Sequence, residues 1–202
     1  MTAQRIKKLT VEEYVELERS TNTKYEYHDG EVFALAGDSF NHALLCSSIF
    51  GELREQLKSK KKNCFAFTSE IKLQIEKFNK YSYPDSMVVC GDFQHPENFE
   101  DAITNPTLIV EVLSDSTEAY DRGEKFKKYQ SLPSFMEYVL ISQYKPMVEV
   151  FYRESNSNIW QINYYEGLEA TFKLQSLSIE ITMEALYERV VFKEETDDSE
   201  NT

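Results

Sequence analysis

The sequence predicts a mixed α/β fold, a sheet flanked by helices, on three observations. Hydrophobic residues make up 41% of the 202 residues and aromatic residues 13%, so the chain can bury a core of its own. Only 6 glycines and 5 prolines are present, which excludes a fibrous chain and extended disorder over most of the length. Segments with helical spacing alternate with segments of strand spacing, in the order helix, hairpin, helix, strands, helix, strands.

The first third of the chain is predicted to hold two helices and a hairpin. A Thr-x-x-Glu capping box that starts at Thr10 opens a short helix. Residues 24–36 alternate around an Asp-Gly pair that ends at Gly30, which is typical of a tight hairpin turn. The next helix is capped by Ser39 or Asn41 and extends to about residue 57, because apolar residues recur there at helical spacing.

The remainder is predicted to consist mainly of strands. Strands are expected at residues 64–67, 71–75, 81–90, 107–113, 137–142, 148–152 and 159–165, and helices at residues 117–131 and 182–189. No internal repeat and no domain boundary is visible, so residues 1–192 are expected to form a single domain. Residues 193–202 are acidic, have no apolar period and are expected to be a disordered tail.

Composition also bears on location. No apolar run reaches the ~20 residues that span a bilayer, and the N-terminus lacks the apolar segment of a secretion signal. The 3 cysteines are widely spaced and fit neither a disulfide framework nor a zinc pattern, which favours a reducing compartment. We therefore expect a cytoplasmic protein with no membrane partner.

The net charge restricts the kind of partner. The chain has 22 basic and 35 acidic residues, a net charge of −13, whereas extended nucleic-acid surfaces normally carry the opposite sign. The acidic tail accounts for part of this excess. The remaining charge still repels DNA at long range unless basic residues cluster or bound cations invert the local sign.

Two acidic residues stand in strands that are otherwise apolar. Glu111 interrupts the apolar residues 107–113, and Asp85 lies in the expected strand 81–90. A carboxylate in such a strand needs a cation, a hydrogen-bond network or a proton to offset its burial. On neighbouring strands ~4.8 Å apart the two acids could share one divalent ion through oxygen ligands. The alternative is a pair of buried acids satisfied by Arg, Lys or backbone donors.

The helix after Glu111 offers a cation. Asp121, Lys125 and Tyr129 recur every four residues and share one helix face. Lys125 could project over the end of the Glu111 strand, where a hydrolytic metal site requires positive charge. The alternative is an ordinary amphipathic helix with a surface ion pair between Asp121 and Lys125.

Seven segments within residues 9 to 192 carry a resemblance to a known family. They are Leu9-Thr-Val-Glu-Glu-Tyr14, Lys24-Tyr-Glu-Tyr-His-Asp-Gly-Glu31, Asn41-His42, Tyr83-Pro-Asp-Ser-Met-Val-Val89, Asn105-Pro-Thr-Leu-Ile-Val-Glu-Val-Leu-Ser114, Ser116-Thr-Glu-Ala-Tyr-Asp-Arg-Gly-Glu-Lys125 and Glu137-Tyr-Val-Leu-Ile141. Together they resemble the Uma2 family, also called DUF820, of restriction-endonuclease-like proteins. Pro84-Asp85 followed by Glu111 also resembles the active-site motif of the PD-(D/E)xK nucleases.

The resemblance implies a restriction-endonuclease-like mixed sheet flanked by helices and a magnesium-dependent endonuclease that hydrolyses nucleic acid, with DNA as the expected partner. It implies that Asp85, Glu111 and the backbone carbonyl of Val112 hold Mg²⁺ or Mn²⁺. The usual motif has a lysine where this sequence has Leu113, and Lys125 takes its place from the next helix. The alternative function is a nuclease-fold binding or assembly module whose catalysis is weak or lost.

Three further residues are accessory candidates. Glu70 starts a second Glu-x-Lys pattern, but it precedes Asp85, which is the wrong order, so it could only border the site as an outer ligand. Glu26 in the hairpin could reach the site or be exposed. His42 at a helix start could be catalytic or a half-buried histidine. The aromatic-rich final strands are either core or the surface of a homodimer.

Overall fold

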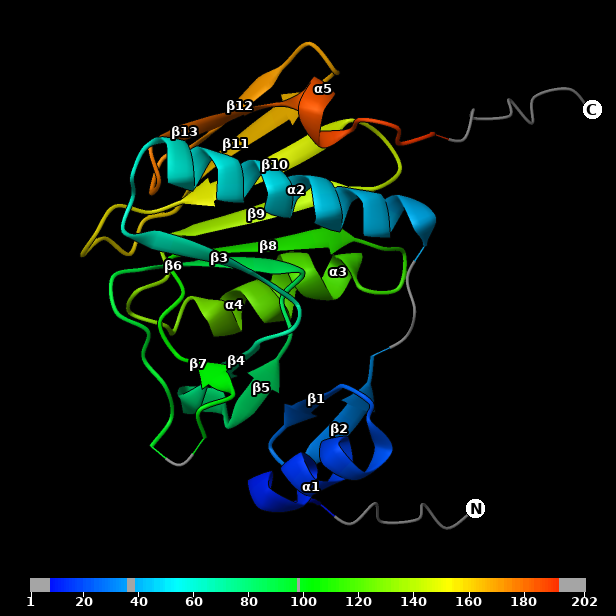
Figure 1. Ribbon diagram of the computed structural model, residues 1–202, viewed down its shortest axis with the longest axis vertical. Helices are drawn as coiled ribbons and strands as arrows, with labels where there is room; N and C mark the ends of the chain where they lie inside the picture. The colour runs from blue at the N-terminus through cyan, green and yellow to red at the C-terminus, as the bar shows by residue number, and fades with distance from the viewer. Residues whose placement is uncertain (1–7, 36–38, 98, 193–202) are drawn as a thin grey trace, which may run out of the picture.

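The computed structural model describes residues 8–35, 39–97 and 99–192, and the predicted acidic tail lies outside these residues. Its strands form three sheets (Figure 1). The central sheet has six strands in the order β11-β10-β9-β8-β6-β3. These strands are β3 (Cys64–Thr68), β6 (Ser86–Cys90), β8 (Leu108–Leu113), β9 (Glu137–Ser142), β10 (Met147–Tyr152) and β11 (Gln161–Glu166).

The central sheet is mixed and covered on both faces, as predicted. β8 and β9 are parallel, whereas the other neighbouring strands are antiparallel. The long helix α2 (Phe40–Ser59) packs on one face. The other face is covered by α3 (Glu118–Tyr120), the π-helical turn η2 (Asp121–Lys125) and α4 (Phe126–Tyr129) (Figure 1). Strand β8 is therefore buried at every position.

A second sheet stands beside the first, in the order β2-β1-β5-β4-β7. Its strands are β1 (Tyr25–His28), β2 (Glu31–Ala34), β4 (Lys72–Ile75), β5 (Lys80–Ser82) and β7 (Ala102–Ile103), and η1 (Glu76–Phe78) joins β4 to β5. Helix α1 (Val11–Thr21) packs on this sheet through Tyr14 and carries the predicted capping box at Thr10. The hairpin turn is also as predicted, with positive φ at Asp29 and Gly30.

The remaining elements pack against α2 and complete the core on that face of the central sheet. β12 (Thr171–Leu174) and β13 (Ile179–Thr182) form a two-stranded sheet, and α5 (Met183–Leu186) follows it. Their apolar side chains join the same buried cluster as α2. These two strands and β7 were not predicted, and the last helix is shorter than predicted. Across the described ranges no helix is long and apolar enough to cross a bilayer.

The predicted strand at residues 81–90 is wrong: it is two strands in two sheets. β5 ends at Ser82 in the second sheet, and β6 begins at Ser86 in the central sheet. Pro84 lies in the break between the two strands. Proline has no backbone N–H to donate, and neither sheet needs a hydrogen bond from this position. The chain thus crosses between the sheets at residues 83–85, which places Asp85 at their junction.

The prediction that the cysteines do not pair is also wrong. Cys64 and Cys90 stand opposite each other on β3 and β6 and form a disulfide. The pairing depends on strand register, which the wide spacing of the cysteines in the sequence does not show. It removes the cysteine-based argument for a reducing compartment.

Candidate active site

Glu111 is the buried acid of the central strand. Its side chain points from β8 toward η2 and α4, and the residue is only 3% exposed. Lys125 Nζ lies 2.8 Å from Glu111 Oε1, and the Tyr129 hydroxyl donates a hydrogen bond to the same oxygen at 2.8 Å. The predicted approach of Lys125 to the Glu111 strand is therefore present in the structure.

Lys125 and Asp121 do not form the surface pair considered as the alternative. Both are buried, and Lys125 Nζ lies 3.1 Å from Asp121 Oδ1. That oxygen has no partner with hydrogen-bond geometry, so the contact is a charge interaction only. The π-helical turn directs both side chains inward, and a π-turn inside a helix is frequent at functional sites. Leu113 fills the adjacent space as a buried apolar residue.

Asp85 lies at the start of β6, next to the end of the Glu111 strand. Its Oδ2 accepts a hydrogen bond of 2.7 Å from the Val112 backbone N–H. The N–H groups of a strand lie in the plane of the sheet and normally donate to a carbonyl of the neighbouring strand. The Asp85 oxygen takes the place of such a carbonyl. His42 Nε2, at the start of α2, lies 3.4 Å from the same oxygen. The structure thus brings His42 to Asp85, whereas Glu111 contacts the elements of the opposite face.

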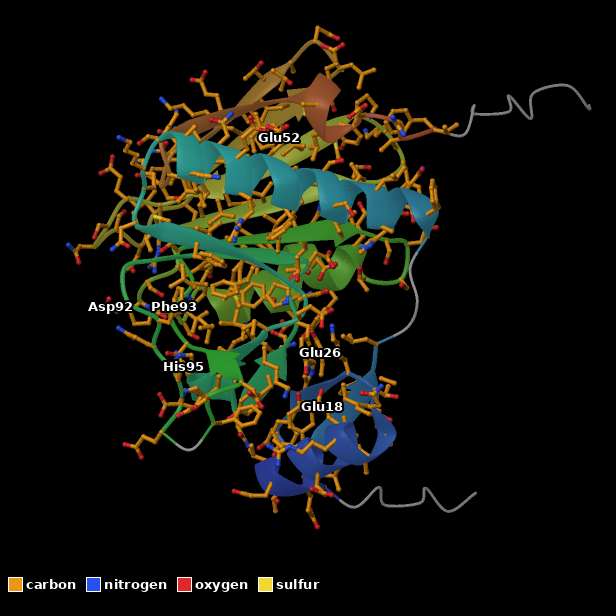
Figure 2. The ribbon with its side chains drawn as sticks, in the orientation of Figure 1. Glu18, Glu26, Glu52, Asp92, Phe93 and His95 are labelled. Carbon is orange, nitrogen blue, oxygen red and sulfur yellow. A yellow bond between two sulfur atoms is a disulfide. The ribbon has the colours of Figure 1, made fainter. Side chains whose placement is uncertain are left out.

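The hairpin contributes a second charged group. Glu26 on β1 accepts a hydrogen bond of 2.9 Å from Lys80 Nζ on β5 and lies 2.9 Å from His28 Nε2. Lys80 also donates a hydrogen bond of 3.0 Å to the Tyr120 hydroxyl of α3. Figure 2 shows Glu26 between the hairpin and the body of the molecule. The sequence indicated Glu26 as a candidate but not Lys80 or His28. Lys80 stands outside the segments that carry the family resemblance, and His28 lies within one of them without an implied role.

Charge links these groups into one cluster, which we call the acid–lysine cluster: Glu26, Lys80, Asp85, Glu111, Asp121 and Lys125. Burial raises the pKa of Glu111 to about 8 although Lys125 opposes this, and the charges of Asp85 and Asp121 raise it further. Burial by itself lowers the pKa of Lys125, but Glu111, Glu26 and Asp121 raise it well above its ordinary value. Lys125 therefore keeps its charge.

The Glu26 carboxylate behaves differently from Glu111. Burial by itself raises its pKa, but the hydrogen bond with His28 and the charges of Lys125 and Lys80 hold that pKa well below its usual range. Glu26 is thus ionised in the folded protein at neutral pH. Burial lowers the pKa of Lys80, while Glu26 counteracts this.

The acid–lysine cluster fits an additional cation. It contains four carboxyl groups and two ammonium groups. Burial is the main cause of the raised pKa of Glu111, and the charges of Asp85 and Asp121, which a bound cation would offset, raise it further. Carboxylate oxygens are the ligands that Mg²⁺ and Mn²⁺ prefer. Asp85 and Glu111 are the acids that could hold such an ion.

Glu70 lies outside this cluster. Its side chain is 76% exposed and forms an ion pair of 2.6 Å with Lys24. The second Glu-x-Lys pattern is therefore not part of the buried site. Its lysine, Lys72, is buried and forms a separate ion pair of 2.7 Å with Glu18 on α1.

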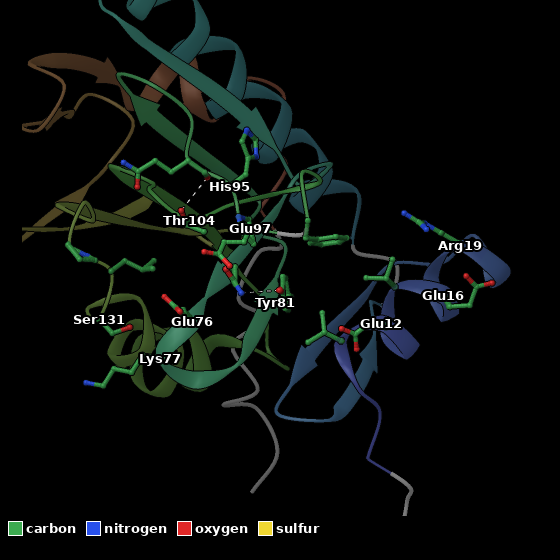
Figure 3. A pocket seen from close by; sticks show the side chains of 18 residues that line it. Glu12, Glu16, Arg19, Glu76, Lys77, Tyr81, His95, Glu97, Thr104 and Ser131 are labelled. Carbon is green, nitrogen blue, oxygen red and sulfur yellow. Dashed lines mark hydrogen bonds between the residues drawn. The ribbon is translucent and has the colours of Figure 1, made fainter.

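A sizeable cavity also lies elsewhere. A groove of about 1140 Å³ is lined by α1, by residues of β4, η1 and β5, and by the loops around His95 and Pro133 (Figure 3). It does not contact Asp85, Glu111 or Lys125. Its charged lining includes Glu12, Glu16, Glu76 and Glu97 but only two basic residues. An acidic groove of this kind does not suit a phosphate backbone, so the charges of the acid–lysine cluster, and not the size of a cavity, identify the candidate site.

A mixed sheet covered by helices on both faces, with a buried acid–lysine pair at strand β8, defines an α/β protein. The model of the Uma2 family, described as "Putative restriction endonuclease", matches residues 11–184. The chain therefore belongs to the Uma2 family.

Individual relatives agree with this assignment. Two uncharacterized proteins of Synechocystis sp. (strain ATCC 27184 / PCC 6803 / Kazusa), slr1290 and sll1609, are 31% and 32% identical to this chain. The matches cover 92% and 85% of this chain, and 94% and 95% of the relatives. The crystal structure of "a putative nuclease belonging to DUF820" from Anabaena variabilis ATCC 29413 is similar in fold, with a TM-score of 0.68 at 16% identity. That match covers 89% of this chain and 97% of the other, and it confirms the predicted fold class.

Proposed function

We propose that this protein is an endonuclease that uses a divalent cation to hydrolyse phosphodiester bonds of DNA. The observation that carries the proposal is the buried Lys125–Glu111 pair, with a distance of 2.8 Å, next to Asp85. Membership of a family described as a restriction endonuclease supports it. Asp85 and Glu111 are assigned as ligands of Mg²⁺ or Mn²⁺.

The Val112 carbonyl is assigned as a third ligand. The Val112 N–H donates its hydrogen bond to Asp85, and the N–H and C=O of one residue in a strand point to the same neighbour. The ladder between β6 and β8 pairs residues 86–88 with residues 108–110, so Val112 lies beyond it. Its carbonyl therefore points to the edge where Asp85 lies.

Lys125 is assigned as the cation that stabilises the transition state. Hydrolysis of a phosphodiester places negative charge on the phosphate oxygens, and a preorganised ammonium lowers the energy of that charge. When bound, the divalent ion would polarise the phosphate and lower the pKa of an attacking water. Asp121 and Tyr138 fix the π-turn from which Lys125 extends, since the Tyr138 hydroxyl donates to the Asp121 carbonyl at 3.2 Å.

A binding or assembly module is the second candidate function, and the net charge of −13 favours it. A protein with this charge needs bound cations to hold DNA, whereas a protein-binding module does not. Such a module would act as a monomer or homodimer and would not require Lys125 or a metal ion.

Cleavage of supercoiled plasmid in Mg²⁺ or Mn²⁺ separates the two candidates. We expect nicking or linearisation by the wild type, its loss in EDTA, and its loss in Asp85→Asn and Glu111→Gln. Asn retains an oxygen that can accept the Val112 hydrogen bond, so Asp85→Asn removes charge with little change of shape. Glu70→Gln is the matched control, since it removes an exposed acid outside the cluster. Absence of metal-dependent cleavage by the wild type would overturn the nuclease proposal, and equal cleavage by wild type and Asp85→Asn would overturn Asp85 as a ligand.

A further inference from the structure

We propose that His42, Cys46 and Asp85 form a binding site for a transition-metal ion of the zinc class. This His–Cys–Asp site is distinct in chemistry from the all-oxygen magnesium site proposed above, although the two share Asp85. The inference requires neither nuclease activity nor a bound magnesium ion.

The geometry of the three side chains carries the inference. One potential ligand atom from each residue lies within 4.8 Å of the other two. His42 Nε2 is 3.4 Å from Asp85 Oδ2, and Cys46 Sγ is 3.4 Å from His42 Nδ1. Zinc binds nitrogen, oxygen and sulfur at about 2.0–2.3 Å, so its ligand atoms stand roughly 3–4 Å apart in a tetrahedron. These two contacts involve opposite nitrogens of the imidazole, and one ion binds only one of them. With one ligand atom taken from each residue, all three atoms lie within 4.8 Å of one another, close enough to surround a single ion.

The ligands extend from rigid elements. His42 and Cys46 are four residues apart on α2 and therefore share one face of its first turns. The Ser39 side chain caps this helix by accepting a hydrogen bond of 3.1 Å from the His42 N–H. Asp85 is held by the Val112 N–H, which orients its carboxylate as outer hydrogen bonds orient the ligands of metal centres. The site is thus largely preorganised.

The donor set determines which ion it prefers. A thiolate and an imidazole are ligands for zinc, cobalt and other first-row transition metals, whereas magnesium selects oxygen. Three protein ligands leave one position of a tetrahedron open for water or another ligand. Partial exposure of Cys46 and Asp85 provides a route for the ion to enter.

The thiol separates this inference from the proposed function. Nothing in the proposed magnesium site uses sulfur, so a signal from a metal–sulfur bond reports on Cys46 alone. The other two cysteines are joined in the disulfide between β3 and β6. Without a reducing agent, Cys46 is the cysteine that keeps its thiol.

Titration of the metal-free full-length chain with Co²⁺, without nucleic acid or reducing agent, tests the site. We expect a thiolate-to-cobalt charge-transfer band in the near ultraviolet, visible ligand-field bands of a tetrahedral ion, and loss of both on addition of Zn²⁺. Cys46→Ser should abolish the charge-transfer band. Cys46→Ser and His42→Gln should each weaken Zn²⁺ binding, measured calorimetrically, by ~100-fold or more, because loss of an outer partner alone typically costs ~10–100-fold.

Two controls make the assignment specific. The double variant Cys64→Ser/Cys90→Ser should keep the band. The double variant Cys46→Ser/Ser47→Cys, which moves the thiol by one residue to a different helix face, should lack it. The circular dichroism spectrum of each variant should match that of the wild type, which checks that the variant is folded. Absence of the band in the wild type, or its survival in Cys46→Ser, would overturn the metal site whether or not the protein cleaves DNA. A normal band in a protein without nuclease activity would overturn only the proposed function.

Discussion

Burial and the charge of Lys125 have opposite effects on the pKa of Glu111. Burial favours the neutral acid, and so do the charges of Asp85 and Asp121, whereas Lys125 favours the carboxylate. The result is a pKa of about 8, so the acid is largely protonated at neutral pH. A divalent ion that binds there competes with this proton.

This pKa predicts a pH dependence of stability. Between the ordinary value of 4.5 and the folded value of about 8, the folded state holds a proton that the unfolded state has lost. The free energy of unfolding should therefore fall as pH rises through this window, by up to ~1.4 kcal/mol per pH unit from this group. Urea unfolding in EDTA at pH 5 to 8.5 measures it. Glu111→Gln should reduce the slope, and parallel curves for wild type and variant would contradict the assigned pKa.

Removal of the Lys125 charge should affect both stability and cleavage. Lys125→Met retains the buried stem but leaves Glu111 and Asp121 without their cation. At neutral pH we expect a loss in the free energy of unfolding below the ~3–5 kcal/mol for breaking a fully ionised buried pair, because Glu111 with its pKa of about 8 is already largely protonated there. The loss should grow above pH 8. We expect plasmid cleavage to fall by ~10²-fold or more if the ammonium stabilises transition-state charge.

The matched control for Lys125 is the next lysine of the same segment. Lys127→Met removes a positive charge two residues away, and Lys127 is not among the contacts of Glu111 or Asp121. It should leave both measurements close to wild type. If Lys125→Met cleaves plasmid as fast as Lys127→Met, Lys125 has no role in the chemistry.

At the scale of the element, the N-terminus of α2 determines where His42 stands. Ser39 accepts the hydrogen bond of the His42 N–H and also contacts Gln143, which joins the helix start to the loop after β9. Gln143 in turn donates a hydrogen bond of 2.8 Å to the Leu113 carbonyl at the end of β8. The cap thus fixes the helix relative to the strand that carries Glu111.

Two serine-to-alanine substitutions on α2 should have opposite effects. Ser39→Ala removes the cap and should lower the free energy of unfolding by ~1 kcal/mol or more. Ser47→Ala, inside the helix, removes an exposed hydroxyl that donates to the Ala43 carbonyl and should raise it by ~0.5 kcal/mol, since alanine is the better helix former. Thermal unfolding of both variants checks the sign. A Ser39→Ala variant as stable as Ser47→Ala would show that the cap contributes nothing.

At the scale of the whole molecule, the disulfide joins an edge strand to its neighbour. Cys64 and Cys90 are 26 residues apart, and the enclosed segment contains β4, β5 and the crossing at Pro84. The link therefore restricts the unfolded chain around the part of the sequence that connects the two sheets.

Reduction of this disulfide should lower the free energy of unfolding by ~3 kcal/mol, the value expected for a closed loop of this size. The wild type should lose this stability in dithiothreitol, and Cys64→Ala/Cys90→Ala should be insensitive to it. A thiol titration of the denatured, unreduced chain should find a single thiol, that of Cys46. Three thiols in that titration would show that the bond does not form.

Much of the secondary structure could be predicted because its signals are local. The capping box at Thr10, the Asp29-Gly30 turn and the apolar spacing of α2 each depend on residues close in sequence, and each is confirmed. Glu111 could be identified as unusual for the same kind of reason, since a carboxylate in a strand apolar on both faces needs a partner wherever the strand lies.

The sequence could not show which charged groups meet. The sequence pattern predicts one strand through Pro84, and only the packing of two sheets shows that the chain crosses between them there. The burial of Lys125 depends on a π-helical turn, which helical periodicity does not predict. Lys80 and Cys46 reach the charged residues through contacts between elements far apart in the chain. The sequence by itself therefore determined most of the elements and the isolated acid, because periodicity and turn chemistry are local. The tertiary structure decided the partners of that acid, because register and burial depend on the whole fold.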